Sequence, residues 1–260
     1  MIYCGVDIGA RSIEIVLFDG AQIIGSVVTN SGNSPIENGR KAFNRALEAA
    51  ELKPEEVTAT VATGYGRNYF EGAEKSCSEI ICHAKGVSYL FPSACTVIDI
   101  GGQDSKLIEL DESGRPVDFV MNDRCAAGTG RFIEMTGNVI GIPLDSMNES
   151  VSPDDGHVDI SSMCAVFAES EIIGLLQGGC KPRVILNGVF RAVARRTMSM
   201  AGRAKIRKEV VFTGGVAKIS GVAMALQKET GIEMHIPHNP QITGALGAAI
   251  IASEKASPSF

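Results

Sequence analysis

The sequence lacks the patterns that mark a secreted or membrane-spanning protein. No apolar run approaches the roughly 20 residues that a membrane-spanning helix needs. Residues 1–4 lead directly into an apolar strand, without a charged leader and an apolar core region, so we expect no secretory signal. These two absences predict a cytoplasmic protein that contacts no membrane.

Cysteine-pair motifs and the usual nucleic-acid pattern are missing too. The seven cysteines, an odd number, contain no C-x-x-C pair, which argues against a disulfide framework and for free thiols or a metal site. The formal net charge is −6, and Lys and Arg are not interleaved with aromatic residues. We interpret the basic stretch at residues 191–208 as the solvent-exposed face of a helix, and expect no nucleic-acid partner.

What the sequence does contain is an internal repeat. An apolar strand carrying Asp-Ile-Gly, then a second strand, a turn and a third strand, runs through residues 5–28 and again through residues 98–121. Asp7 and Asp99 are 92 positions apart, as are the turn residues Asp19 and Asp111. Glycine lets backbone N–H groups approach an anion, and a carboxylate reaches a metal ion through water. One copy alone is a weak signal, but two predict a nucleotide clamp in two halves.

A third glycine turn completes this pattern. Gly214-Gly215 follows an apolar strand at residues 210–213 and precedes an expected helix at residues 220–230, and the missing side chains would let an adenosine lie on the backbone. In order and content, the three turns resemble the phosphate 1, phosphate 2 and adenosine motifs of the superfamily of actin, sugar kinases and Hsp70. The resemblance implies an α/β fold with a duplicated actin-like (ribonuclease H-like) ATPase core, two lobes and a nucleotide cleft between them.

The remaining elements follow from apolar periodicity. We expect residues 1–93 to form the N-terminal lobe and residues 94–260 the C-terminal lobe, whose last helix, at 244–252, would cross back. Other segments are predicted as a strand at 59–62, a loop at 145–155, and helices at 37–52, 78–89, 127–140, 166–176 and 183–203.

Two cysteines stand directly before expected helices. Cys125 precedes the helix at 127–140 and Cys164 the helix at 166–176, and free N–H groups at a helix N-terminus would favour a thiolate-bound anionic cluster. An iron–sulfur cluster usually needs four thiolates, and a two-fold dimer would supply the second pair. Ordinary packing is the alternative. We interpret the other five thiols as structural: Cys77, Cys82, Cys4, Cys95 and Cys180. Cys77 and Cys82 are five positions apart, which would place them on different faces of a helix.

Four longer motifs, at residues 63–68, 98–104, 122–132 and 164–171, closely resemble the ATP-dependent activators (component A) of 2-hydroxyacyl-CoA dehydratases, in the BadF/BadG/BcrA/BcrD-like ATPase family. The resemblance implies a homodimer in which one [4Fe–4S] cluster bridges the subunits through Cys125 and Cys164. It also implies that ATP drives a low-potential electron into a partner iron–sulfur enzyme, and that a flavodoxin or ferredoxin is the electron donor. The partner would be a dehydratase, a benzoyl-CoA-type reductase or a double-cubane cluster protein.

The same reasoning assigns roles within the nucleotide site. We expect Asp7 and Asp99 to hold Mg²⁺ through water, and either Gln103 or Asp104 to orient the attacking water. Glu14 stands where many family members have Lys, so the side-chain contacts of the first phosphate loop are expected to differ from theirs. Contacts to ATP or ADP are expected from Gly9, Ala10, Arg11, Ser12, Gly101, Gly102, Gln103, Gly214, Gly215, Val216, Lys218 and Gln241.

Two other functions fit the same clamp. A small-molecule kinase would use Asp104 as the base toward a substrate hydroxyl. A nucleotide-gated scaffold would bind ATP without redox chemistry. Colour separates the candidates, because an activator would be brown, bleached by air, with about two irons per chain.

Overall fold

The computed structural model describes residues 1–122, 125–150, 155–161, 164–202 and 206–256. The chain divides into two compact units. Unit 1 comprises Met1–Val97, Ile108–Asp118 and Pro237–Phe260, and unit 2 comprises Ile98–Leu107 and Phe119–Ile236. The C-terminal residues therefore belong to the same unit as the N-terminal ones.

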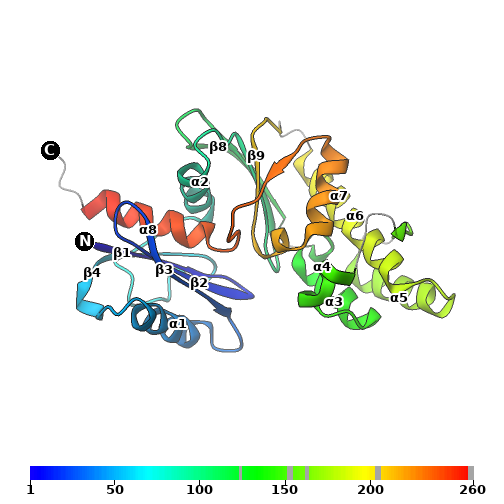
Figure 1. Cartoon of the computed structure of the whole chain (residues 1–260), viewed down its shortest axis with the longest axis horizontal. Helices are drawn as coiled ribbons and strands as arrows, with labels where there is room; N and C mark the ends of the chain where they lie inside the picture. The colour runs from blue at the N-terminus through cyan, green and yellow to red at the C-terminus, as the bar shows by residue number, and fades with distance from the viewer. Residues whose placement is uncertain (123–124, 151–154, 162–163, 203–205, 257–260) are drawn as a thin grey trace. The chain divides into compact units, whose positions relative to one another are not determined.

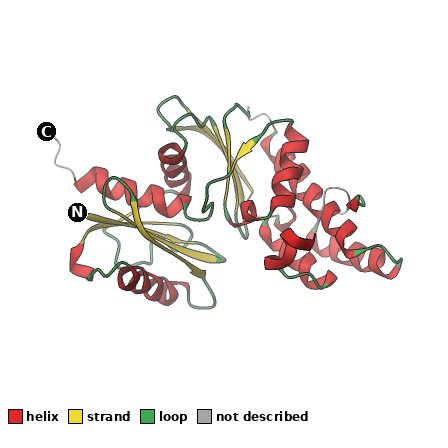
Figure 2. Ribbon diagram, viewed as in Figure 1, coloured by secondary structure: helices red, strands yellow, loops and turns green. Residues whose placement is uncertain are grey.

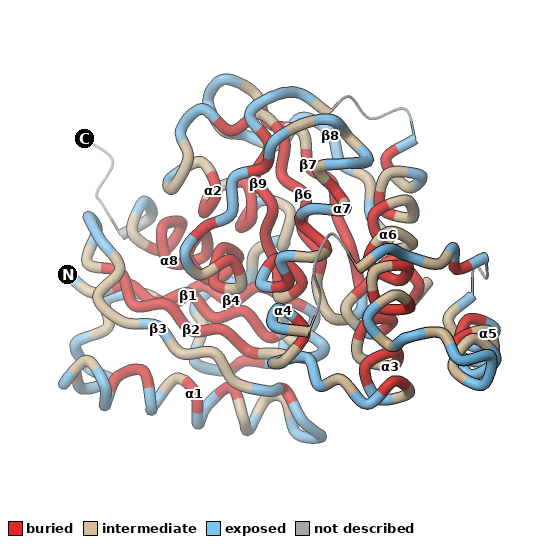
Figure 3. The backbone as a smooth tube through the Cα atoms, turned by 45° about the vertical axis from the view of Figure 1, so that its right-hand side comes forward, coloured by how far each residue is buried: buried red, intermediate tan, exposed pale blue. Residues whose placement is uncertain are grey.

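Unit 1 is built on a five-stranded sheet with the order β3-β2-β1-β4-β5. β1, β2 and β3 pair antiparallel, whereas β4 pairs parallel with both β1 and β5. The central strands are buried along almost their whole length, as Figure 3 shows for β1 and β2. The strands are β1 (Ile2–Ile8), β2 (Ser12–Phe18), β3 (Ile23–Asn30), β4 (Val57–Thr63) and β5 (Lys75–Ser76).

Helices cover both faces of this sheet (Figures 1 and 2). Side chains alternate between the faces of a strand. On β1, Cys4 and Val6 therefore pack with α1 (Pro35–Ala49), while Tyr3 packs in a second cluster with α8 (Thr243–Ala256). α2 (Glu79–Leu90) packs against α8, and the 3₁₀ turn η1 (Pro54–Glu56) leads into β4.

The second sheet has the order β8-β7-β6-β9-β10. This order matches that of the first sheet when β6 to β10 are taken as the counterparts of β1 to β5. The internal repeat therefore extends beyond the three strands seen in the sequence, to the fourth and fifth positions of each sheet. Its strands are β6 (Thr96–Ile100), β7 (Ser105–Leu110), β8 (Pro116–Asn122), β9 (Val210–Thr213) and β10 (Met234–His235).

The turns joining the second and third strands are alike as well. Asp19 Oδ1 accepts the backbone N–H groups of Ala21 and Gln22, and Asp111 Oδ1 accepts those of Ser113 and Arg115. These bonds lower the pKa of both carboxyl groups below the usual value, because they favour the charged form.

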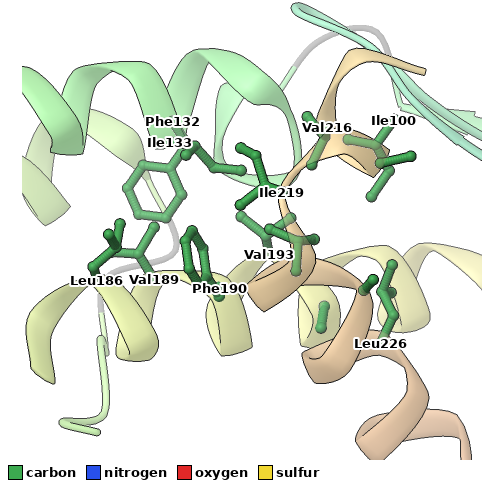
Figure 4. Close-up of a cluster of buried hydrophobic side chains, with 14 of the residues drawn as sticks. Ile100, Phe132, Ile133, Leu186, Val189, Phe190, Val193, Val216, Ile219 and Leu226 are labelled. Atoms are coloured by element: carbon green, nitrogen blue, oxygen red, sulfur yellow. The ribbon is translucent and has the colours of Figure 1, made fainter. Parts of the chain in front are cut away.

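Unit 2 carries a helical segment between β8 and β9. Its elements are η2 (Ala126–Gly128), α3 (Gly130–Ile140), η3 (Leu144–Ser146), α4 (Met147–Ser150), α5 (Ala165–Gln177) and α6 (Pro182–Ala201), and α7 (Ser220–Thr230) follows η5 (Gly215–Lys218) after β9. Their apolar side chains form one core with the sheet. In Figure 4, Phe132 of α3 lies beside Phe190 of α6, while Ile219 and Leu226 contribute from the α7 side. Among the described helices, none is long and apolar enough to cross a membrane.

Most predicted elements are confirmed, with ends shifted by a few residues, but two predictions were wrong in detail. The segment predicted as a loop at 145–155 contains η3 and α4, because the Met147 side chain is fully buried in the core. The helix expected from residue 127 begins at Gly130, since residues 126–128 form a 3₁₀ turn closed by Thr129, whose N–H and hydroxyl both donate to the Ala126 carbonyl.

Residues 123–124, 151–154, 162–163 and 203–205 of the segments discussed above lie outside the described residues.

Cys77 and Cys82 do not lie on one helix, so the prediction that they occupy different helix faces was wrong. α2 begins at Glu79, and Cys77 lies before it, with its N–H donating to the Ala62 carbonyl at 2.8 Å. The neighbouring Cys77 thiol and burial together raise the pKa of the Cys82 thiol well above its usual value. Burial likewise raises the pKa of Cys4. Cys95 and Cys180 are partly exposed.

Candidate nucleotide and cysteine sites

The first phosphate turn follows β1. Gly9 N–H donates to the Ser12 carbonyl at 3.0 Å, and a Cβ at Gly9 would lie 2.8 Å from that same oxygen, so only glycine closes the turn without displacement. Ser31, directly after β3, supports the turn through a hydroxyl bond of 2.7 Å to the Gly9 carbonyl. Ala10 and Arg11 are exposed at its tip.

Asp7, just before this turn, is enclosed by two glycines. A Cβ at Gly64 would lie 2.4 Å from Asp7 Oδ1, and a Cβ at Gly244 would lie 2.3 Å from Oδ2. Gly244 belongs to the first turn of α8, whose positive dipole end favours a carboxylate. His83, buried on α2, bonds to Thr243 in the same turn at 3.1 Å. Asp7 is thus a nearly buried anion at a helix N-terminus.

The second phosphate turn repeats the first. Gly101 N–H donates to the Asp104 carbonyl at 2.9 Å, which is the bond between Gly9 and Ser12 shifted by 92 positions. Gln103 is exposed on this turn, whereas the Asp104 side chain is buried. The two candidates for orienting water therefore differ in their access to solvent.

A buried ionic group lies behind the second turn. Lys106 Nζ is 2.8 Å from Asp104 Oδ2 and 3.5 Å from Asp99 Oδ2, and the hydroxyl of Thr213 donates to Asp99 Oδ1 at 2.8 Å. All four residues are buried. Lys106 and Thr213 were not singled out in the sequence, since a lone Lys or Thr within a strand carries no distinctive signal.

The predicted adenosine turn continues β9. Gly214 has φ +86°, and a Cβ there would lie 2.3 Å from the Ile100 carbonyl oxygen. Gly64 in unit 1 has φ +84°, and its Cβ would meet the Ile8 carbonyl oxygen at 2.5 Å. Thr63-Gly64 is therefore the counterpart of Thr213-Gly214, a correspondence that the sequence analysis missed because the spacing from the repeated Asp differs between the copies.

Other predicted nucleotide residues have different environments. The Val216 side chain is buried in the core of unit 2 (Figure 4), while Lys218 is exposed. Asn148 of α4 ties this region together, because it donates to the Lys218 carbonyl at 2.8 Å and accepts the Ser220 N–H at 2.8 Å. Gln241 is partly buried and belongs to unit 1.

The two candidate ligand cysteines each precede a helical turn. Cys125 is the residue before η2, and Cys164 is the residue before α5 and is exposed. Asn122 at the end of β8 holds Cys125 at both backbone groups, accepting its N–H at 3.0 Å and donating to its carbonyl at 2.8 Å. Within the described residues, no group of three or more Cys, His, Asp or Glu side chains forms a metal site.

The start of α3 is bonded directly to the second phosphate turn. The N–H groups of Gly130 and Arg131 donate to the carbonyls of Gly101 and Gly102, both at 2.9 Å. A Cβ at Gly130 would lie 3.1 Å from the Gly101 oxygen, so the contact suits glycine. A displacement of this turn therefore acts on the helix five residues after Cys125.

Two sheets of one strand order, each carrying an Asp followed by a glycine-closed turn, define a duplicated α/β ATPase of the actin-like fold. A solved ROK family glucokinase from Streptomyces griseus has a TM-score of 0.60 to this chain at 14% identity, over 98% of this chain and 100% of that one, which is a likeness of fold alone. The model of the BadF/BadG/BcrA/BcrD ATPase family matches residues 4–252, and this chain belongs to that family.

Three relatives that match this chain over nearly their whole length bear dehydratase-activator names. The activator of lactoyl-CoA dehydratase from Anaerotignum propionicum is 45% identical over 98% of this chain and 99% of its own. The solved (R)-2-hydroxyglutaryl-CoA dehydratase component A of Acidaminococcus fermentans has a TM-score of 0.95 at 40% identity, over 99% of both chains. The solved activator of 2-hydroxyisocaproyl-CoA dehydratase from Clostridium difficile, with bound ADPNP, has a TM-score of 0.93 at 38% identity, covering 98% of this chain and 96% of that one.

Proposed function

We propose that this protein is an ATP-hydrolysing iron–sulfur activator that delivers a low-potential electron to a 2-hydroxyacyl-CoA dehydratase or a related iron–sulfur enzyme. Family membership and the names of the three relatives described above support the activator role. The electron donor would be a flavodoxin or ferredoxin, and the protein would act in the cytoplasm. The small-molecule kinase is not favoured, since the glucokinase shares only the fold.

The nucleotide would be held by the glycine-closed turns. Gly9 to Ser12 and Gly101-Gly102 would bind the phosphates, Gly214, Gly215, Val216 and Lys218 the adenosine, and Gln241 would add a contact. Mg²⁺, when bound, would neutralise phosphate charge. Asp7 and Asp99 are the candidates for a contact to Mg²⁺ through water, because each carboxylate stands just before a glycine-closed phosphate turn. Gln103 or Asp104 would orient the attacking water.

The cluster would be held by Cys125 and Cys164 from both subunits of a homodimer. Within the described residues neither cysteine forms a disulfide, and both precede helical turns whose N–H groups favour anionic thiolates. One [4Fe–4S] cluster per dimer would supply a one-electron carrier. Two cysteines per chain fit this group only when a second subunit contributes the other two.

One observation carries the link between nucleotide and cluster. The hydrogen bonds from Gly130 and Arg131 to Gly101 and Gly102 tie the second phosphate turn to the helix that follows Cys125. Movement of the turn on ATP binding or hydrolysis would reach this cysteine through three residues of η2 and the start of α3. Hydrolysis would thereby gate electron transfer.

Anaerobic purification of the wild-type protein tests the proposal. We expect a brown protein with about two irons per chain that hydrolyses ATP and supports electron transfer to an added dehydratase. Asp99→Asn should lower ATP turnover at least about tenfold, equivalent to about 1.4 kcal/mol, while iron content is retained. The exposed Asp118→Asn is the matched control and should leave both unchanged. A colourless, iron-free protein, or full turnover in Asp99→Asn, would contradict the proposal.

A further inference from the structure

Lys106 is a buried cation at the heart of the second repeat. It is the second residue of β7, only 2% exposed, and its ammonium group contacts Asp104 Oδ2 and Asp99 Oδ2. Burial of a charge is costly unless the charge is paired, so the three groups depend on one another. Water cannot take the place of either aspartate beside Lys106, because the side chains of Asp99 and Asp104 are only 4% and 9% exposed.

The remaining oxygen of each carboxylate is fixed from another direction. Thr213 donates to Asp99 Oδ1 at 2.8 Å. Asp104 Oδ1 lies against the Gly101 backbone, because a Cβ on Gly101 would come within 2.7 Å of it. Lys106 is therefore the shared contact that fixes the orientation of both carboxylates.

Stability alone is a weak reason for such an arrangement. A buried ion pair is often no more stabilising than apolar residues of similar volume, and the next two residues of β7, Leu107 and Ile108, are fully buried apolar side chains. The charged group instead lies at the end of β6, beside the turn that contributes Gly101 and Gly102. Its position suits the fixing of charge next to phosphates.

We propose that Lys106 is a positioning residue for ATP hydrolysis, which fixes the Asp99 carboxylate toward the metal and turns Asp104 away from the attacking water, leaving the exposed Gln103 to orient that water. The inference rests on the proposed nucleotide site and narrows it. Asp104 becomes part of the support behind the turn. The water contact falls to the residue of the turn that is open to solvent.

The test compares Lys106→Met with the double variant Lys106→Met/Asp104→Asn. The single variant leaves two buried carboxylates without a cation and should be less stable, whereas the double variant restores the net charge of the group and should melt near the wild-type temperature. In the double variant we expect kcat to fall at least about tenfold and KM for Mg-ATP to change less than about threefold. Calorimetry measures the factor by which Mg²⁺ increases the affinity for ADP. In the double variant this factor should be at least about threefold smaller than in wild type, and the affinity for ADP without Mg²⁺ should be unchanged.

Two further variants keep the outcome interpretable. Lys85→Met, which removes a half-exposed ion pair with Glu254, is the matched control and should change none of these quantities. Thr213→Val removes the hydroxyl bond to Asp99 without altering any charge. If the double variant does not fold, Thr213→Val takes its place in the test, and it should show the same loss of kcat and of the Mg²⁺ effect. Wild-type kcat with a wild-type Mg²⁺ effect in either variant would overturn the positioning role. Absence of ATP hydrolysis by the wild-type protein would instead contradict the proposed function.

Discussion

Lys106 occupies in the second repeat the position that Glu14 occupies in the first, 92 residues earlier, and both side chains are buried although their charges are opposite. Glu14 lies directly opposite Asp7 in the β1–β2 pairing, while Lys106 contacts Asp99. The two copies therefore support the equivalent aspartates differently. Gly64 lies against Asp7 as Gly214 lies against Asp99, but the second copy adds the cation of Lys106, whereas the first adds Gly244 at the start of α8.

We expect Cys125→Ser and Cys164→Ser each to abolish cluster binding, because each change removes two of four ligands in a symmetric dimer. Iron analysis and visible absorption of anaerobically purified protein measure the loss. Cys77→Ser, a thiol of unit 1, serves as the control and should keep the cluster. Full iron and wild-type absorption in Cys125→Ser would rule out the bridging arrangement.

We expect Gly64→Ala to damage both stability and ATP turnover. Alanine at φ +84° is strained, and its Cβ would displace the Asp7 carboxylate, so unfolding should become easier by about 1–3 kcal/mol and turnover should fall at least about tenfold. Gly231→Ala is matched in φ, at +67°, with no atom within 4 Å of its Cβ. That control should lose stability only, and equal turnover in both variants would remove Asp7 from the site.

Gly130→Ala should weaken the connection between nucleotide and cluster. The added methyl would push on the Gly101 carbonyl, at 3.1 Å, and disturb the two bonds that join the turn to α3. We expect ATP to accelerate removal of iron by a chelator in wild type and to have little effect in the variant, while ATP hydrolysis continues. Gly174→Ala in α5 has open space at its Cβ and is the control. An undiminished ATP effect in Gly130→Ala would exclude this route.

Nucleotide and cluster should also influence each other in free energy. A typical coupling of about 1 to 3 kcal/mol corresponds to a shift of roughly 40 to 130 mV in the potential of a one-electron couple. By reciprocity, reduction of the cluster should change nucleotide affinity by the same factor. Anaerobic redox titration with Mg-ADP and with Mg-ATP measures the shift, and identical potentials in both would leave electron gating without a basis.

The repeat was predictable because it is local. Strand periodicity and the shared spacing of Asp7 and Asp99 were enough for three strands of each sheet. β5 and β10 were not predicted, since two-residue strands are too short to show alternation. α4 is four residues long and was read as loop because its composition is polar, although Met147 anchors it in the core.

Side-chain partnerships across the sequence were beyond prediction from composition. Thr213 bonds to Asp99 across 114 positions, and Asn148 bonds to Ser220 across 72. A single sequence shows each residue type but not which distant strand ends become neighbours. Lys106 illustrates the limit, because a charged residue in a strand usually indicates an exposed position.

The close fit of α8 on β1 bears on how the chain folds during synthesis. A Cβ at Gly5 would lie 1.8 Å from the Ala245 carbonyl oxygen, and a Cβ at Gly247 would lie 1.8 Å from that of Cys82, so backbone meets backbone where α8 crosses β1 and α2. Domains generally fold as units, N-terminal first, as the chain leaves the ribosome. Here β1, which leaves the ribosome well before α8, must wait for α8 before one face of its sheet is covered. Nascent chains of this protein should therefore need protection from aggregation until α8 has been synthesised.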